Sequence, residues 1–546
     1  MKKALFIGLS FVTLLCTAQT ISPKRGVGLM EPASEAKLNT LKKGCSWYYN
    51  WSDKSLGNFG ESIEYVPMIW TFGSKRAPAT QAEIDEIYSR VPTQEQYDAF
   101  WAAGPTQEEI DAFYANIPRN EDLEALWDRP FSRTWQEIED FKAHGTDALD
   151  AYIAQHPSIK YILAFNEPNF KDQACLSPKA AAAAWPGIEK VAKKYNLKIV
   201  GPALNFSPDA PYNDPVKWYE DFFAACPDCQ VDYIALHFYM PNLDGLRGAL
   251  YQFYKFNKPI WLTEFNYSLD GYNDTMDKQI EYAQECIEWL ENEPMIFRYA
   301  WFLAYHTESY CFILSNPKEA ITDLGKIYLG MSSYDSNHYF NINENIPAEH
   351  YISKNNITLS AIPTSNDIQL ECLGNSTINY QINIKKAGTY YFNVNAACRF
   401  DNATLTISKN EKNITTIPIK KTGNMTKFDT STQEIDLPKG KYTITLKSNK
   451  AFYLNWLSIS DSPENIVGCE RESFEKIKIY PSIISDIATI DFEGNIDEVM
   501  VYNLSGKLEY QISNTKEINL SHLDAGNYLI ICKSGDKYYN QTIVKQ

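Results

Sequence analysis

The sequence predicts a multidomain protein, in which a (β/α)8 TIM barrel is followed by a β-sandwich and a small C-terminal all-β domain. From residue 24 to about 330, short apolar runs alternate with helical patterns, which is typical of βα units around a parallel sheet. After Gly330 the helical periodicity ends, and strands separated by Gly, Asn and Lys turns follow. The length of 546 residues has room for roughly two to four domains.

The first 18 residues are predicted to be a signal peptide. Lys2 and Lys3 precede an apolar run from Ala4 to Leu15, and Ala18 is a small residue at the expected cleavage point. Cys16 leaves a lipoprotein as the weaker alternative, because Leu15 stands where a small residue would precede a lipidated cysteine. No other stretch reaches the ~18 apolar residues of a membrane span. We therefore expect a secreted or cell-surface protein without a transmembrane segment.

Charge and cysteine content exclude several classes of function. The net charge of -17 and the absence of a basic cluster argue against a nucleic-acid partner. Cys226 and Cys229 form the tightest cysteine pair, but no second pair or nearby histidine pair completes a zinc site. A local disulfide and two free thiols both remain open. We expect no metal, no cofactor and a monomer.

The predicted barrel spans residues 24–332 and contains eight candidate strands. They lie at 25–29, 45–51, 64–70, 161–167, 198–205, 232–239, 259–266 and 298–305. Helix starts lie between them, such as Ser177 followed by Pro178 and Asp214 followed by Pro215.

A helical insertion at 75–120 interrupts the barrel after the third strand. It contains a 13-residue repeat with prolines at 92, 105 and 118. Each copy opens with a threonine followed three residues later by Glu or Gln, the pattern of a capping box. Because loops after barrel strands surround the active face, this insertion either flanks a substrate groove or is a solvated appendage.

The rest of the chain is predicted to be all-β. Residues 340–462 have the size and alternation of one sandwich, and residues 475–546 form short strands after a second break near "SDSPENIVGCERES". Neither part carries chemistry comparable to that of the barrel.

Two glutamates close barrel strands. Glu167 ends the fourth strand in "AFNEPN", and Glu264 ends the seventh in "WLTEFN". All strands of a parallel barrel open onto one face at their C-terminal ends, so we expect these carboxyl groups to converge. Glycoside hydrolysis needs such a pair, because one carboxyl group protonates the leaving oxygen while the other attacks or activates water. The alternative for Glu264 is a partly exposed strand-end carboxylate.

Further polar and aromatic residues end strands at the same face and are candidate substrate contacts. They are Asn166, His237, Tyr239, Trp301, Trp47, Tyr48 and Trp70. For His237 the alternative is a hydrogen-bonded structural residue, and for the tryptophans it is the hydrophobic core.

The barrel resembles a known enzyme family. "RGVGL", "SWYYNW", "YVPMIW", "LAFNEPN", "GPALN", "ALHFY" and "WLTEFN" follow one another as in glycoside hydrolase family 128 of clan A, the endo-β-1,3-glucanases. The resemblance implies that Glu167 is the acid/base, that Glu264 is the nucleophile, and that Asn166 contacts the sugar 2-hydroxyl. The 13-residue repeat departs from the family's compact barrel.

The other two parts also resemble known families. "IPAEHY", "INYQINIKKAGTYYFNVNAA" and "FYLNWLSI" are similar to carbohydrate-binding module family 6, although its usual binding tryptophan has no counterpart here. "IKIYPS", "VYNLSGK" and "LDAGNYLI" resemble the C-terminal sorting domain of type IX secretion.

These resemblances imply a secreted retaining β-1,3-glucanase that binds glucan polysaccharides or oligosaccharides. The alternatives are a retaining clan A hydrolase of another β-glycan and a surface glycan-binding protein with an inactive barrel.

Overall fold

The computed structural model describes residues 21–546 apart from 31–33, 56–62, 268–274, 306–311, 316–319, 364, 464–474, 482, 493, 504–507 and 535–536. The predicted signal peptide at 1–18 lies outside the described residues. The chain divides into two compact units. One holds residues 18–342 and 346–457, and the other holds the C-terminal residues 458–546 together with 343–345.

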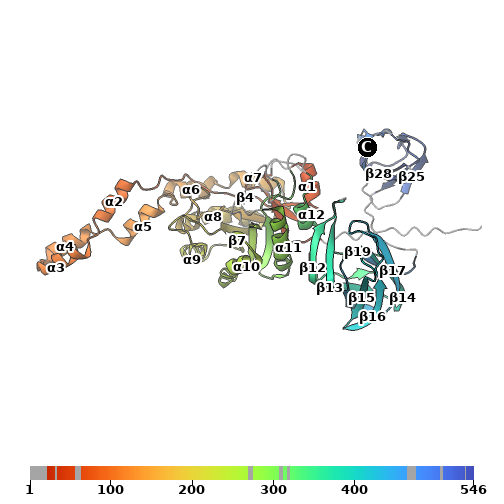
Figure 1. Ribbon diagram of the computed structural model, residues 1–546. Helices are drawn as coiled ribbons and strands as arrows, with labels where there is room; N and C mark the ends of the chain where they lie inside the picture. The colour runs from red at the N-terminus through yellow and green to blue at the C-terminus, as the bar shows by residue number, and fades with distance from the viewer. Residues whose placement is uncertain are drawn as a thin grey trace, which may run out of the picture. The chain divides into compact units, whose positions relative to one another are not determined.

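The first unit begins with a curled parallel sheet that helices surround (Figure 1). Its strands follow the order β3-β2-β1-β9-β8-β7-β6-β5-β4. Their bounds are β1 Arg25–Gly28, β2 Trp47–Tyr49, β3 Glu64–Tyr65, β4 Met68–Ile69, β5 Tyr161–Ala164, β6 Lys198–Leu204, β7 Tyr233–Met240, β8 Ile260–Tyr267 and β9 Ile296–Trp301. All eight predicted strands are present. The third is divided into β3 and β4 at Pro67, which has no N–H to donate.

Helices follow most of these strands. They are α1 Glu35–Leu41, α6 Trp135–His144, α7 Asp147–Gln155, α8 Pro178–Tyr195, α9 Pro215–Ala225, α10 Leu243–Tyr251, α11 Met276–Asn292 and α12 Asp323–Gly330. The predicted helix starts are confirmed. Ser177 accepts a hydrogen bond from the backbone N–H of Ala180, and Asp214 accepts one from that of Val216, as N-cap side chains do.

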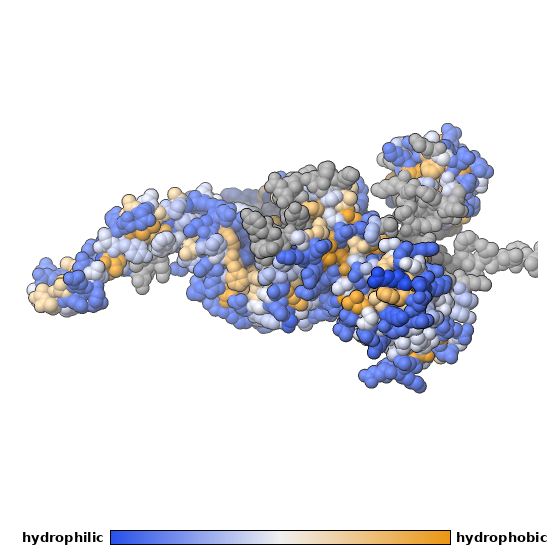
Figure 2. All heavy atoms as spheres, viewed as in Figure 1, coloured by the Kyte–Doolittle hydropathy of each residue, from blue (hydrophilic) through white to orange (hydrophobic). Residues whose placement is uncertain are grey.

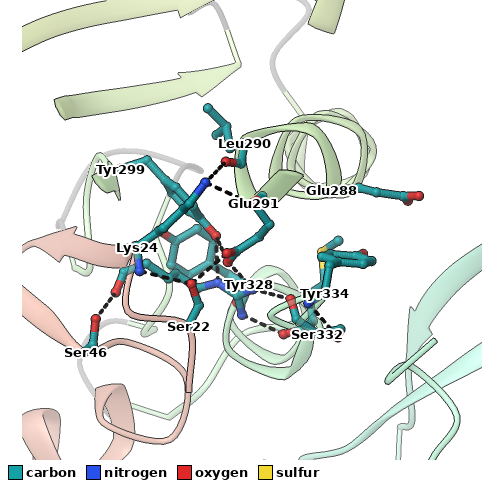
Figure 3. A network of polar contacts seen from close by, with 12 residues as sticks. Ser22, Lys24, Ser46, Glu288, Leu290, Glu291, Tyr299, Tyr328, Ser332 and Tyr334 are labelled. Atoms are coloured by element: carbon teal, nitrogen blue, oxygen red, sulfur yellow. Dashed lines mark hydrogen bonds and ion pairs between the residues drawn. The ribbon is translucent and has the colours of Figure 1, made fainter. Parts of the chain in front are cut away.

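A buried polar network ties β1 to the helices α11 and α12. Arg25 is 1% exposed, and its guanidinium pairs with Glu291 at 3.0 Å. The same group donates to the Tyr299 hydroxyl and to the carbonyls of Met331 and Ser332 beyond α12. Figure 3 shows Glu291 and Tyr299 within this network. Because each donor of a buried arginine needs an acceptor, this network joins both ends of the barrel segment.

The insertion after β4 forms an arm of four short helices. They are α2 Gln81–Ser89, α3 Gln94–Ala102, α4 Gln107–Asn116 and α5 Asn120–Asp128. Capping boxes begin α2, α3 and α4 as predicted, whereas α5 begins at Arg119 with only half of this pattern, a hydrogen bond from the Arg119 backbone N–H to the Asp122 carboxylate at 3.0 Å. Arg129 pairs with Glu83 at 3.0 Å, and the ring of Phe100 on α3 stacks on Phe113 of α4 at 4.1 Å. The arm therefore runs outward through α2 and α3 and returns through α4 and α5 (Figure 1).

A β-rich domain makes up most of the rest of the first unit, although two of its strands end in residues of the other unit, Asn345 and 458–460. It contains β12 Ser353–Ala361, β13 Ile368–Ile384, β14 Gly388–Ala397, β15 Thr404–Lys409, β16 Lys412–Pro418, β17 Asp429–Leu437, β18 Gly440–Ser448 and β19 Phe452–Ser460, with the short strands β10 Phe340–Asn341 and β11 Asn345–Pro347. The long strand β13 pairs with β12, β18 and β19. Contacts with the barrel include Lys354 to Glu288 at 2.9 Å and Tyr334 to Tyr351 at 3.2 Å.

The C-terminal unit is built from two small sheets. One contains β20 Glu475–Lys476, β22 Ile483–Ile484, β24 Glu498–Asn503, β25 Leu508–Ser513, β27 Gly526–Ser534 and β28 Lys537–Lys545, and the other contains β21 Lys478–Tyr480, β23 Ile487–Asp491 and β26 Glu517–Asn519. Buried aliphatic side chains such as Ile479, Val499 and Ile530 form its core.

Cys226 and Cys229 form a disulfide, which decides between the two alternatives left by the sequence. The other cysteines that the structure describes are buried and free. Among the described residues, no helix is both long enough and apolar enough to cross a membrane.

Candidate active site

Glu167 lies just beyond β5 in a strained segment. Phe165 and Glu167 have positive φ angles of 64° and 45°, a region that side-chain-bearing residues rarely adopt and that is over-represented at functional sites. The neighbouring strands hold this backbone in place. The N–H of Glu167 donates to the Ala203 carbonyl at 2.9 Å, and the N–H of Asn166 donates to the Trp70 carbonyl at 3.0 Å.

Glu264 reaches the same face because β8 contains a bulge. Trp261 belongs to the cluster inside the barrel, so strict alternation along the strand would direct Glu264 outward. Leu262 pairs with Leu236 of β7, but the next pair is Glu264 with His237, which leaves Thr263 as an extra residue. A bulge of this kind re-aims the following side chain.

The two carboxyl groups meet at His237. Its Nδ1 lies 3.0 Å from Oε1 of Glu167 and 3.3 Å from Oε2 of Glu264. One carboxylate oxygen of each glutamate and one histidine nitrogen all lie within 4.8 Å of one another. Such a set also resembles a metal-binding group. The contact between Nδ1 and the Glu167 carboxylate also fits proton transfer between these two groups.

Three further donors hold the Glu264 carboxylate. The indole Nε1 of Trp51 donates to Oε1 at 2.8 Å, and the Tyr49 hydroxyl donates to the same oxygen at 3.1 Å. The Tyr239 hydroxyl donates to Oε2. Donors aimed at a carboxylate favour its ionised form and fix its direction.

Burial and the central histidine set the protonation of the site. Burial raises the pKa of Glu264 above its ordinary value, against the opposing effects of His237 and the hydrogen bonds from Tyr239 and Trp51. Burial also raises the pKa of Glu167, but the hydrogen bond and charge of His237, with a bond from Asn205, outweigh it and leave this pKa lowered. Burial lowers the pKa of His237, while the two carboxylates more than compensate and leave it raised. The free site therefore favours a proton on His237 beside an ionised Glu167.

Several residues predicted from the sequence lie at this site. His237 and Tyr239 bond the carboxyl groups directly. Asn166 is next to Glu167 and donates from Nδ2 to Gln173 at 3.2 Å, while its buried Oδ1 finds no hydrogen-bond partner in the described part of the chain. Trp70 is half-buried and contacts Asn166 through its backbone.

Three predicted aromatic contacts do not face the site. Trp47 is fully buried, and its indole donates to the Lys24 carbonyl at the opposite end of the barrel. Tyr48 is 3% exposed and bonds Ser55. Trp301 is fully buried against Tyr328. A fully buried ring cannot stack on a sugar, so the expectation that these residues contact substrate is wrong, and the core alternative holds for both tryptophans.

The residues that sequence reasoning missed are neighbours of those it chose. Tyr49 and Trp51 share the inward face of their segment with Trp47, and Phe302 follows Trp301. Phe302 is partly exposed and contacts Trp51 and Tyr239 with ring centroids 5.8 and 5.6 Å apart. Side chains alternate between the faces of a strand, so this period was the signal that would have found them.

Comparison with known families agrees with this site. The family described as "Glycosyl hydrolase catalytic core" matches residues 26–93 and 115–328, just over half of the chain. The chain belongs to this glycosyl hydrolase family. This glycoside hydrolase also carries a match to "Carbohydrate binding module (family 6)" at 347–461 and to "Secretion system C-terminal sorting domain" at 478–546. The sorting domain indicates type IX secretion to the medium or the cell surface.

Individual proteins that resemble the chain share between 25% and 29% sequence identity with it. The hydrolase is 25% identical over 200 residues to Alkali-sensitive linkage protein 1 of Schizosaccharomyces pombe, a match that covers 34% of this chain and 36% of that protein. It is 29% identical to the glycoside hydrolase family 128 (subgroup II) endo-β-1,3-glucanase of Pseudomonas viridiflava, with 57% and 98% of the two chains covered and a TM-score of 0.41. For the subgroup II enzyme of Sorangium cellulosum the identity is 28%, the coverage 56% and 97%, and the TM-score 0.38.

Proposed function

We propose that the protein is a secreted, retaining glycoside hydrolase that cleaves β-1,3-glucan. The observation that carries the mechanism is that one carboxylate oxygen of Glu167 lies within 4.8 Å of one carboxylate oxygen of Glu264. Retaining enzymes hold their carboxyl groups about 5–5.5 Å apart, whereas inverting enzymes need roughly 6.5–9.5 Å to admit a water molecule. The short separation supports direct attack by one carboxylate.

Glu264 is the nucleophile in this mechanism. Its three donors favour the ionised form against the effect of burial, which raises its pKa, and they fix the direction of the carboxylate. The carboxylate attacks the anomeric carbon, the bond to the leaving oxygen breaks, and that oxygen takes a proton from Glu167. In the second step Glu167 removes a proton from water, the water oxygen bonds to the anomeric carbon, and Glu264 leaves.

His237 supplies the proton that Glu167 needs. The hydrogen bond between them is 3.0 Å long, so one proton can move from Nδ1 to Oε1 without rearrangement. The raised pKa of His237 keeps this proton in the site near neutral pH. The pair thus stores one proton, which is the number that the first step consumes.

The glucan assignment rests on the strand motifs, which resemble family 128 across residues 24–330. Asn166 supports it locally, because its buried Oδ1 has no partner in the described part of the chain and can accept a hydrogen bond from a sugar hydroxyl. We also propose that the barrel is a closed (β/α)8 barrel, since the edge strands β3 and β4 are separated only by Val66 and Pro67. The β-rich domain is proposed to be a sandwich, and residues 1–18 a cleaved signal peptide.

Reducing-sugar release tests the proposal. Laminarin and curdlan should be hydrolysed, while xylan, mannan and cellulose should not. NMR during hydrolysis should show the β-anomer as the first product. Preferred hydrolysis of another β-glycan would refute the substrate, and initial α-anomer would refute the mechanism.

A further inference from the structure

The arm formed by α2–α5 contains a recurring feature that the catalytic mechanism does not use. Its 13-residue units begin at Thr80, Thr93, Thr106 and Arg119. The ninth position of each unit is an exposed aromatic residue: Tyr88 is 47% exposed, Trp101 43%, Tyr114 46% and Trp127 44%. Four equivalent positions therefore present a ring to solvent to nearly the same extent.

Packing within the arm accounts for these rings only in part. Trp101 contacts Phe100 and Tyr97 with ring centroids 5.7 and 6.5 Å apart, and the hydroxyl groups of Tyr97 and Tyr114 form a 2.6 Å hydrogen bond, yet Trp101 and Tyr114 remain exposed. The preceding position of each unit supplies the inward side chain, as in the stacked pair Phe100 and Phe113. Helices α2, α3 and α4 contain no buried residue. Scattered exposed apolar residues need no explanation, but exposed apolar side chains that are grouped on one part of a molecule mark an interaction surface, and these four rings lie on the four helices of one small arm. Apolar and hydrophilic residues lie side by side on the arm in Figure 2.

The chain segment that leads into the arm starts beside the catalytic residues. It follows β4, the strand next to β5, and Glu167 lies at the C-terminal end of β5. At its root the Thr71 hydroxyl donates to the Ala174 carbonyl, and the Ala174 N–H donates to the Asn166 carbonyl. Trp135, which is 72% exposed, begins α6, the first helix after the arm. Two helices of nine residues at 1.5 Å per residue extend roughly 27 Å from this root.

The negative charge of the arm limits the kinds of ligand that it can bind. Residues 80–128 contain 12 Asp or Glu and only two basic residues, Arg90 and Arg119. An anionic ligand or the arm of a second copy of this chain would be repelled. A neutral polysaccharide is not repelled, its apolar sugar faces match exposed rings, and its hydroxyl groups match the carboxylates and amides beside them, such as the pair Gln94 and Asp98.

From these observations we infer that the arm is a second glucan-binding surface, which holds a neutral β-glucan chain on Tyr88, Trp101, Tyr114 and Trp127 while the barrel cleaves it. This inference rests on the proposed glucan substrate. The catalytic-core match omits residues 94–114, so the outer part of this surface is an addition to the matched core. A second attachment raises the effective concentration of polymer at the site without changing the chemistry.

Binding to insoluble curdlan tests the surface. The full chain carrying Glu264→Gln, which blocks turnover, is sedimented with curdlan, alone and with alanine at positions 88, 101, 114 and 127. We expect the added substitutions to weaken binding about tenfold or more, because linked sites contribute multiplicatively. Tyr251→Ala in the same background is the matched control, since Tyr251 is 43% exposed on α10, and it should leave binding unchanged.

Two further measurements distinguish failure of the proposed surface from failure of the proposed function. The substituted arm with Glu264 intact should keep the kcat/KM of the parent enzyme on short laminarioligosaccharides, which do not extend from the active site to the arm, and its Tm should stay within about 2 °C. Absence of hydrolysis by the parent enzyme would refute the proposed function, whereas curdlan binding that is undetectable or unaffected by the arm substitutions would refute the surface. The contribution of the arm to curdlan binding should persist at about 1 M NaCl, where the Debye length is ~3 Å. Its loss at this salt concentration would indicate that the arm binds a cationic ligand, and it would also refute the glucan-binding surface.

Discussion

The indole Nε1 of Trp51 donates a 2.8 Å hydrogen bond to Oε1 of Glu264. Trp51 has a φ angle of 57°, an unfavourable conformation for a bulky residue. The strand that ends at Tyr49 thus continues into a strained residue whose side chain positions the proposed nucleophile.

Trp51→Phe should lower kcat/KM by about 10- to 100-fold, because a hydrogen bond to a charged group contributes roughly 1.5–3 kcal/mol. The ring contact with Phe302 would be largely kept. Tyr48→Phe is the control. Tyr48 is three residues away but faces outward to Ser55, and its loss should leave kcat/KM unchanged. Equal effects of the two substitutions would contradict the positioning role of Trp51.

Substitution of the two glutamates should separate their roles. Glu264→Gln should abolish turnover by removing the nucleophile. Glu167→Ala should reduce it by about 10²–10⁴-fold, the usual contribution of general acid–base catalysis. On aryl glucosides with good leaving groups, azide should restore the Glu167→Ala variant by attacking the glycosyl-enzyme. Rescue of Glu264→Gln instead, or losses below about tenfold in both variants, would reassign the chemistry.

The pH profile should report the proton held between His237 and Glu167. In the parent enzyme the alkaline limb of kcat/KM should lie above pH 6.5, because the pKa of His237 is raised from that value by the two carboxylates despite its burial. In His237→Gln the acid proton resides on Glu167 alone, and without the lowering effect of His237, burial raises the pKa of this carboxyl group above its ordinary value of 4.5. The alkaline limb should therefore move toward lower pH, because a carboxyl group replaces an imidazole of ordinary pKa 6.5, but it should stay above 4.5. An unchanged limb would exclude His237 as the proton store.

Loss of the Trp301 ring should lower stability, whereas loss of the Phe302 ring should lower activity. Trp301→Ala removes a fully buried ring and should lower the free energy of unfolding by about 3–5 kcal/mol, measured by urea denaturation. Phe302→Ala should leave stability closer to that of the parent enzyme and lower kcat/KM by about two- to tenfold, the range expected for lost contacts to Trp51 and Tyr239. The reverse pattern would place Trp301 at the substrate.

The thermal stability of the barrel segment should depend on residues beyond α12. A chain that stops at Gly330 lacks the carbonyls of Met331 and Ser332, which accept from Arg25 at 2.7 and 2.8 Å. It should unfold at lower temperature than a chain that stops at residue 462, since buried charged donors without acceptors are costly. Thermal unfolding of the two chains is the measurement. Equal Tm values would show that the barrel is stable without this polar network.

The helix starts and the strand-end glutamates were determined by the sequence alone, because they depend on local chemistry. Ser177, Asp214 and the threonines of the 13-residue repeat cap helices through bonds to backbone groups two or three residues away, and such bonds do not depend on distant parts of the chain. The apolar runs before Glu167 and Glu264 likewise predicted two strands whose ends open onto one face, although β5 ends at Ala164, before Glu167, and β8 continues beyond Glu264 to Tyr267.

The face on which each side chain lies was decided by the tertiary structure. Trp47 and Tyr48 cannot point the same way in one strand, and the sequence does not state which of them faces inward. Along β8 the extra residue Thr263 reverses the alternation before Glu264, and that bulge exists only in the pairing with β7. The sequence therefore selected Trp301, whereas Trp51 and Phe302 are the residues that face the site. Which side chain of a strand faces inward depends on the register between strands that are distant in the chain.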